Sequence, residues 1–432
     1  MKFFIQTFGC KVNLYESQWL TDYLTGLGYE YDKELEKADI IIINSCTVTS
    51  QGDSRAVSFL KKAKKQAPDA VTVMTGCFPQ ARGAEDIDAD IVTGTVNRHR
   101  IPELISEYLA RHEKICAVQP LSEARDFEDM ICSSFHGHTR AFVKIQDGCN
   151  QFCTYCAIPY ARGRCRSKTP EAIKRELEAI AGNGFREVVF SGINLAFWGV
   201  EWGLSLRDAV KIAAETTGIE RIRLSSLEPE RLTDEDISYF ASLDKFCPQF
   251  HLSLQSGCDR TLKAMHRKYS TAEYAALAKK IKTALPDAAL TTDVMVGFPG
   301  ETEEDFEESL NFVKSIGFAK VHVFRYSRRK GTPADKMPGQ VAERIKTERF
   351  HKMTAVCEKN AENFHKSLVG KTFPVLFEKQ KSPNIVHGHA PNGVVIKISE
   401  KNPKKGLRNS IFYVTIVSGD DNCCYGVFAD RG

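Results

Sequence analysis

Three cysteines lie close together in one loop of the chain, and they constrain how that part of the chain can fold. Cys149, Cys153 and Cys156 follow Asp147-Gly148 with the spacing C-x3-C-x2-C. Three thiolates on one tight loop can bind three irons of a cubane iron–sulfur cluster, which leaves the fourth iron open to a substrate. Zinc is the competing metal, but structural zinc sites take four ligands, commonly from two C-x2-C pairs. The sequence holds no second such pair, so an iron–sulfur site is predicted.

The segments on either side of this loop predict a strand before it and a helix after it. Residues 141–146 alternate apolar and polar side chains, as a half-buried strand does. Thr169-Pro170 is typical of a helix N-cap followed by proline at the first helical position. On this loop and its setting the chain resembles the radical S-adenosylmethionine (SAM) enzymes. The resemblance implies that SAM binds the open iron through its amino and carboxylate groups, and that reduction releases a 5′-deoxyadenosyl radical.

A second set of cysteines follows the predicted strands of the N-terminal region. Apolar runs at residues 2–8, 40–43 and 70–74 alternate with amphipathic segments, which predicts a βαβαβ unit with a parallel sheet. Each run is followed within three residues by a cysteine, and these are Cys10, Cys46 and Cys77. Parallel strands end at one edge of an open sheet, where ligands bind. Three cysteines at this position favour a second cluster site over three small core residues. The other eight cysteines show no comparable pattern and are interpreted as packing or surface residues.

The sequence around these cysteines resembles the methylthiotransferases, which are radical-SAM enzymes with an N-terminal auxiliary cluster held by three cysteines. The matching segments are Gly9-Cys10-Lys11-Val12-Asn13, Asn44-Ser45-Cys46-Thr47-Val48 and Thr75-Gly76-Cys77. Within that family, Gly-Cys-Lys-Val-Asn is similar to the branch that acts on N6-threonylcarbamoyladenosine in tRNA. The resemblance covers nearly the whole chain. It implies two [4Fe-4S] clusters, one on each cysteine set, and SAM as a further cofactor.

The centre of the chain alternates strands and helices. Six strand-like runs are predicted, at residues 141–146, 187–190, 221–224, 250–254, 290–296 and 320–326. Six strand–helix units predict a partial parallel barrel, whose functional groups lie at the carboxyl ends of the strands. The resemblance implies that these ends form the SAM pocket, and we expect Ser191, Gly192, Glu228 and Gln255 to contact SAM. Asp293 lies inside a strand, where a structural carboxylate and a ligand are equally expected.

The last part of the chain, from Lys366, differs in pattern and charge. Short alternating strands at residues 372–378, 394–399 and 411–417 predict a small β-barrel. Residues 366–432 hold ten Lys or Arg and five Asp or Glu, a net charge of +5 against +4 for the whole chain. This segment resembles the TRAM domain that ends the methylthiotransferases, which implies RNA binding. A second basic cluster is predicted at the barrel mouth, where it could meet phosphates; it consists of Arg325, Arg328, Arg329 and Lys330.

The sequence thus predicts an α/β chain with three domains, at residues 1–115, 135–365 and 366–432. The N-terminus has too short an apolar run for a signal peptide. No stretch approaches the roughly 20 apolar residues that a membrane helix needs. Fourteen cysteines scattered through 432 residues are typical of a reducing compartment. We therefore expect a cytoplasmic protein with no membrane partner.

The resemblance implies a tRNA methylthiotransferase. The cluster at Cys149, Cys153 and Cys156 would generate the radical that takes hydrogen from C2 of the modified adenine at position 37, beside the anticodon. The cluster at Cys10, Cys46 and Cys77 would deliver sulfur, and a second SAM the methyl group. The implied partners are the tRNA anticodon stem-loop and an electron donor such as flavodoxin or ferredoxin.

Two alternatives remain at this point. The first is the same chemistry on isopentenyladenosine tRNA or on a ribosomal protein. The second is a non-enzymatic iron–sulfur or zinc RNA-binding protein.

Overall fold

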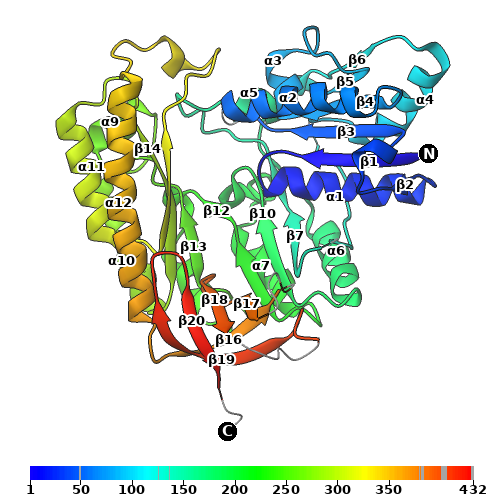
Figure 1. Ribbon diagram of the computed structural model, residues 1–432. Coiled ribbons are helices and arrows are strands. Elements are labelled where there is room, and N and C mark those ends of the chain that lie inside the picture. The colour runs from blue at the N-terminus through cyan, green and yellow to red at the C-terminus, as the bar shows by residue number, and fades with distance from the viewer. Residues whose placement is uncertain are drawn as a thin grey trace.

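The protein is described by a computed structural model that covers residues 1–47, 50–124, 126–135, 137–378, 380, 384–399 and 406–429. Figure 1 shows an N-terminal sheet flanked by helices, a central curved set of strands, and a small C-terminal β-barrel beneath the central strands. This is the α/β architecture that the sequence predicts.

The N-terminal sheet has six parallel strands in the order β2-β1-β3-β4-β5-β6. The three predicted strands are confirmed as β1, β3 and β4, and they lie side by side. The run Ile40–Ile43 is fully buried because both faces of the sheet are covered, with Ile40 and Ile42 in one apolar cluster and Ile41 and Ile43 in another. The elements are β1 Lys2–Thr7, α1 Lys11–Gly26, β2 Glu30–Tyr31, β3 Ile40–Ser45, α2 Ser50–Gln66, β4 Val71–Gly76, α3 Cys77–Arg82, β5 Ile91–Thr93, α4 Ile101–Arg111 and β6 Ile115–Ala117.

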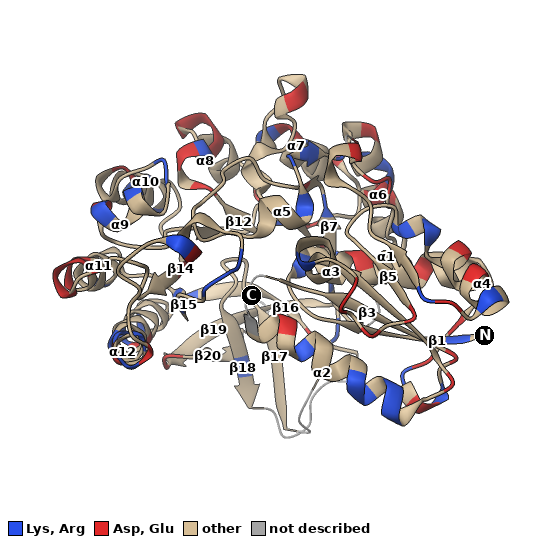
Figure 2. Ribbon diagram, turned by 90° about the horizontal axis from the view of Figure 1, so that it is seen from above, with Lys and Arg blue, Asp and Glu red and all other residues tan. Residues whose placement is uncertain are grey.

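The central region contains the six predicted parallel strands, arranged as two adjoining sheets. One has the order β11-β10-β7 and the other β12-β13-β14-β15, and β12 continues the chain directly after β11. Figure 2 shows these strands as an open curve with helices α6 to α12 along its outer side. The strands are β7 Arg140–Lys144, β10 Glu187–Ser191, β11 Arg221–Leu224, β12 Ser226–Leu227, β13 Gln249–Leu252, β14 Ala289–Val296 and β15 Lys320–Arg325. The outer helices are α6 Pro170–Gly182, α7 Leu206–Glu215, α8 Asp234–Ala241, α9 Asp259–Ala264, α10 Thr271–Ala284, α11 Glu303–Ile316 and α12 Glu343–Ser367.

Local sequence sets where several of these helices begin. Thr233, Ser270 and Thr302 each form a capping box with an acidic residue three positions later. Thr169 accepts a hydrogen bond from the backbone N–H of Ala172 and so caps α6. These caps fix the lengths of the loops that follow the carboxyl ends of the strands.

The C-terminal barrel is closed by five strands in the order β16-β17-β18-β20-β19. The three predicted strands are confirmed as β16 Thr372–Phe377, β18 Val395–Ser399 and β19 Ile411–Gly419; β17 Ile385–His389 and β20 Cys424–Phe428 complete it. The barrel lies against the amino ends of the central strands. Arg223 donates to the backbone oxygen of Pro391 at 2.9 Å, and Arg140 forms an ion pair with Glu378 at 3.2 Å.

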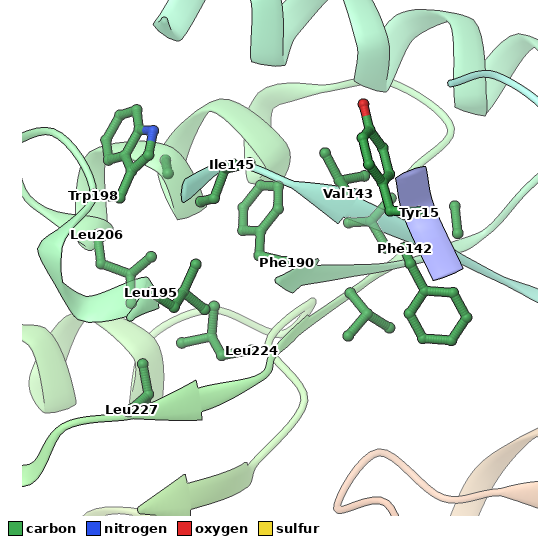
Figure 3. Packing of buried hydrophobic residues seen from close by; sticks show 14 of the residues in the cluster. Tyr15, Phe142, Val143, Ile145, Phe190, Leu195, Trp198, Leu206, Leu224 and Leu227 are labelled. Carbon is green, nitrogen blue, oxygen red and sulfur yellow. The ribbon is translucent and has the colours of Figure 1, made fainter. Parts of the chain in front are cut away.

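One apolar cluster joins the N-terminal sheet to the central strands. Tyr15 of α1, Phe142 of β7 and Phe190 of β10 are buried in it, and Figure 3 shows these side chains close together. The edge of the N-terminal sheet is therefore held in a defined place beside the central strands. Among the described residues, no helix is long and apolar enough to cross a membrane.

Candidate functional site

The loop that carries the central cysteines follows β7 and the short strand β8 Gln146–Asp147 and leads into α5 Ile158–Arg162. Gly148 has φ +70°, and a Cβ there would lie 1.9 Å from the backbone oxygen of Arg164, so only glycine fits. The backbone N–H of Cys149 donates to Gly163 at 3.0 Å, and that of Cys156 donates to Cys153 at 3.0 Å. The structure therefore brings all three predicted cysteines to the carboxyl end of β7.

Hydrogen-bond donors surround the sulfurs of this loop. Cys149 Sγ accepts from the backbone N–H of Gln151 at 3.4 Å and from Asn194 Nδ2 at 3.7 Å. Cys153 Sγ accepts from Arg267 Nη1 at 3.3 Å. Such donors suit thiolates that ligate a metal. Burial raises the pKa of Cys156 to about 12, so iron would have to displace a proton there.

The N-terminal cysteines lie at one edge because of the register of three adjacent strands. Thr7 of β1 pairs with Asn44 of β3, and Ser45 of β3 pairs with Gly76 of β4. The residues that follow the ends of these three strands in the chain therefore lie next to one another. A Cβ on Gly9 would lie 2.7 Å from Cβ of Cys46, which shows how closely the segment before Cys10 packs on Cys46. The structure thus gathers Cys10, Cys46 and Cys77 as predicted.

The two cysteine sets are not arranged around a single metal ion. No three His, Cys, Asp or Glu side chains in the described ranges stand close enough to hold one ion. A cubane cluster requires a wider spacing, because each thiolate binds a different iron. Three cysteines at one edge and three in one loop fit this larger group, and side-chain donors reach the sulfurs of Cys77, Cys149 and Cys153.

A fully buried charge network joins the two cysteine sets. Arg162, which ends α5, donates through Nε to Cys77 Sγ at 3.1 Å and through its Nη atoms to both carboxylate oxygens of Glu16. Lys144 bridges Glu16 at 2.8 Å and Asp147 at 2.6 Å. Asp147 stands two residues before Cys149. Arg98 and Arg166 add two further buried cations to the same carboxylates.

Charges in this network shift the pKa of its acids. Burial alone would raise the pKa of Glu16, but the cations of Arg162, Arg98 and Lys144 lower it to about 2. Burial raises the pKa of Cys77 to about 12, against the opposing effect of Arg162. Sequence reasoning missed Glu16 and Arg162, since nothing in a single sequence distinguishes a buried ion pair from two surface residues.

The four residues expected to contact SAM do not lie in one place. Three of them line two different cavities, and the fourth forms an ion pair. Ser191 and Gly192 line a cavity of about 580 Å³ inside the curve of central strands. Gln255 lines a smaller one of about 190 Å³ beside Cys156. Glu228 lines neither; it pairs with Arg267, the same arginine that donates to Cys153. Burial raises the pKa of Glu228, although Arg267 opposes the rise.

Asp293 lines both cavities and so lies where they meet. Its carboxylate is 3.3 Å from His251 Nε2. The neighbouring Gln255 has φ +66°, a conformation that non-glycine residues rarely adopt, and its backbone bonds to both sides of Val294. The two backbone hydrogen bonds to β14 hold Gln255 in this conformation.

The predicted basic cluster at the barrel mouth is only partly exposed. Arg325, Arg328 and Lys330 are exposed, whereas Arg329 is buried and binds Thr47 and Asp53 of the N-terminal region. Arg329 is therefore a contact between the two parts and not a phosphate ligand, which corrects its prediction. In the C-terminal segment, Lys401, Lys404 and Lys405 lie outside the described residues.

Comparisons with known proteins agree with this arrangement. Residues 143–313 match the model of the Radical SAM superfamily, and residues 2–94 match Uncharacterized protein family UPF0004. Together with the fold, these matches define a radical-SAM enzyme. A threonylcarbamoyladenosine tRNA methylthiotransferase of Bacillus subtilis is 37% identical over 89% of this chain and 88% of its own length. A tRNA-2-methylthio-N(6)-dimethylallyladenosine synthase of Clostridium beijerinckii is 38% identical over 87% of this chain and 85% of its own length.

The chain belongs to the radical-SAM methylthiotransferase family. Its cofactors are SAM and two [4Fe-4S] clusters. The solved structure of the radical-SAM methyltransferase TsrM from Kitasatospora setae shares the fold, with a TM-score of 0.58 and 13% identity over 77% of this chain and 74% of that one. OxsB, a cobalamin-dependent radical-SAM enzyme, has a TM-score of 0.52 over 83% of this chain and 56% of that one.

Proposed function

We propose that this protein adds a methylthio group to C2 of N6-threonylcarbamoyladenosine at position 37 of tRNA. Overall similarity does not select this substrate, because relatives named for two different adenosines match almost equally well. The chemistry of the larger cavity supports it. That cavity lies beside Cys10 and is lined by cationic and polar side chains, among them Lys11, Arg223 and His322. A polar substituent on N6 is easier to place there than a hydrocarbon chain.

We further propose that each cysteine set holds one cluster. Cys149, Cys153 and Cys156 would leave one iron open for SAM, and Cys10, Cys46 and Cys77 would hold the auxiliary cluster. When bound, these groups supply the radical that removes hydrogen from C2, together with the sulfur and the methyl group. The chain's own contribution is to hold the two cysteine sets in a fixed relation, one beside each of the two adjoining cavities, through the network of Glu16, Arg162 and Asp147.

We propose that SAM occupies the smaller cavity, beside the central cysteine loop. Gln255, Asp293 and the backbone beside Cys156 line this space, and Tyr155 and Met295 give it an apolar wall suited to an adenine ring. Ser191 and Gly192 face the adjoining larger cavity. Glu228 would act indirectly, by holding Arg267 against Cys153.

The RNA would approach from the open top of the central strands. Phe324 is 45% exposed there, next to Arg325, and a base could stack on it. Figure 2 shows further Lys and Arg on α2, at the same side of the molecule. We propose that the C-terminal barrel adds affinity through its basic residues, and that the partners are the anticodon stem-loop and a reducing protein such as flavodoxin or ferredoxin, in the cytoplasm.

Mass spectrometry of tRNA nucleosides tests the proposal. A strain that lacks this gene should lose 2-methylthio-N6-threonylcarbamoyladenosine and accumulate the unthiolated nucleoside, and the wild-type gene should restore the product. Loss of the dimethylallyl product instead would show that the substrate is the other adenosine. No change in any tRNA nucleoside would favour a ribosomal protein or a non-enzymatic role.

A further inference from the structure

We infer that Lys11 binds the carboxylate of the threonylcarbamoyl group and so selects the substrate. This inference rests on the proposed function and names the residue that recognises the N6 substituent. It follows from the cavity beside Cys10, from the charges that line it, and from the geometry of adenine.

The cavity is formed by alternate residues of the central strands, whose side chains all point inward. Five of the strands, β7, β10, β13, β14 and β15, contribute a pair of alternate residues, for example Val189 with Ser191, and Thr291 with Asp293. Residues 9–12, at the start of α1, close the open side of this curve. Lys11 is therefore presented to the cavity by the same turn that presents Cys10. The cavity's volume of about 580 Å³ is typical of a small-molecule site.

Two of the cavity's cations are already neutralised by the protein. Arg140 pairs with Glu378 at 3.2 Å, and Arg223 pairs with Glu187 at 2.8 Å. In the described part of the chain no ion pair joins Lys11 or Lys320 to a carboxylate, but Lys320 lies at the amino end of β15, whereas Lys11 adjoins Cys10 and is exposed to the cavity. Lys11 thus offers a free ammonium group close to Cys10.

The surroundings of Lys11 are rich in positive charge. Arg140, Arg223 and His322 line the same cavity, and the ammonium group of Lys11 has no carboxylate partner among the described residues. A carboxylate placed beside it would supply the missing counter-charge.

The shape of the modified adenine would bring the carboxylate of its N6 substituent close to Lys11. C2 and the N6 substituent both flank N1, on the same edge of the base. If C2 faces the two cysteine sets, a substituent on N6 must lie close to them as well. The residue next to Cys10 is then within reach of the substituent's end. A dimethylallyl group in the same place would leave the Lys11 ammonium without a partner, which penalises that substrate.

Binding of three synthetic anticodon stem-loops to the full-length protein tests this. One carries N6-threonylcarbamoyladenosine, the second its threonine methyl ester, which keeps the shape but removes the charge, and the third the dimethylallyl group. Dissociation constants are measured with the cluster-loaded protein and again with the cluster-free protein. The wild type should bind the acid about ten- to one-hundredfold more tightly than the ester, as expected for a charged hydrogen bond.

Lys11→Met should lose this preference by weakening the acid complex alone, with binding of the ester unchanged. Lys11→Arg should keep most of it. Lys33→Met is the matched control, since it removes one exposed lysine of the same N-terminal region away from the cavity, and its preference should equal that of the wild type. Unchanged iron content in all variants shows that Cys10 still holds its cluster.

Three results would overturn the inference. If the wild type thiolates the acid but binds the ester equally well, the proposed function stands and the role of Lys11 fails. If Lys11→Met impairs binding of SAM and not of the acid, the lysine serves the cofactor. If the wild type prefers the dimethylallyl RNA to both others, the proposed function and this inference fail together.

Discussion

Arg162 Nε donates a hydrogen bond to Cys77 Sγ at 3.1 Å, and both groups are fully buried. The same guanidinium binds Glu16, and Lys144 continues the network to Asp147, next to the central cysteine loop. One arginine therefore connects the edge of the N-terminal sheet to the loop that follows β7. This contact explains how two cysteine sets that are far apart in the sequence are held at a fixed distance from each other.

Replacing Arg162 should alter the auxiliary cluster. Arg162→Gln removes a cation beside Cys77, and a more negative surrounding disfavours the reduced cluster, so its reduction potential should fall. Arg162→Lys keeps the charge and should retain the potential better, although it loses the forked contact with Glu16. Redox titration followed by electron paramagnetic resonance measures this. An unshifted potential and full iron content in Arg162→Gln would show that the contact is incidental.

Glu16 should stabilise the fold in a pH-dependent way. Its pKa is lowered from 4.5 to about 2, so its contribution is complete above about pH 4.5 and is lost as the pH falls toward 2. Glu16→Gln leaves buried cations uncompensated and should cost about 3–5 kcal/mol at neutral pH. Urea unfolding of the cluster-free protein at several pH values measures both effects. Glu113→Gln, an exposed control, should leave the profile unchanged.

The two cysteine sets should each account for about half of the iron and sulfide, as two clusters of equal size require. Changing Cys149, Cys153 and Cys156 to alanine should remove half of the iron and abolish reductive cleavage of SAM. The corresponding change of Cys10, Cys46 and Cys77 should also halve the iron but leave some cleavage without thiolated product. Full iron content in either triple variant would mean that its cysteines hold no cluster.

Neighbouring arginines at the barrel mouth should behave differently. Arg328 is 60% exposed, so Arg328→Ala should weaken tRNA binding and reduce the salt slope by roughly 0.7–0.9. Arg329 is buried against Asp53, so Arg329→Ala should lower the melting temperature and leave the salt slope unchanged. Filter binding across a salt series and thermal unfolding separate the two. A reduced slope in Arg329→Ala would restore it as a phosphate contact.

The basic residues of the C-terminal barrel should add affinity without affecting chemistry. Replacing Lys401, Lys404, Lys405 and Arg408 with alanine should weaken tRNA binding and flatten its salt dependence, because phosphate contacts release counterions. Iron content and SAM cleavage without RNA should stay as in the wild type. The same affinity and slope in this variant would show that the central region binds the RNA alone.

Strand positions and cysteine sets were predictable because they depend on local pattern. Apolar runs locate β1, β3 and β4 and all six central strands, and parallel topology then brings their ends together. The short strands β2, β5 and β6 have only two or three residues each, too few for an alternating pattern to identify them. The strand β17 was missed because histidine and glycine interrupt its apolar pattern.

The charge network and the role of Arg329 could not be predicted for a different reason. A single sequence shows that Glu16, Arg162 and Arg329 are charged, and charged residues are usually exposed. Only the docking of the N-terminal sheet on the central strands buries them, and that docking depends on contacts between residues more than one hundred positions apart. Lys11 was visible as part of a motif, but its place in a cavity was not.

A competition assay with the reconstituted enzyme tests the central proposal most directly. Equal amounts of anticodon stem-loops carrying N6-threonylcarbamoyladenosine and the dimethylallyl nucleoside are incubated with the protein, SAM and a reductant, and the nucleosides are then analysed by mass spectrometry. The proposal predicts that the 2-methylthio group forms on the threonylcarbamoyl nucleoside, in strong preference to the other. Methylthiolation of the dimethylallyl nucleoside, with the threonylcarbamoyl nucleoside unchanged, would contradict it.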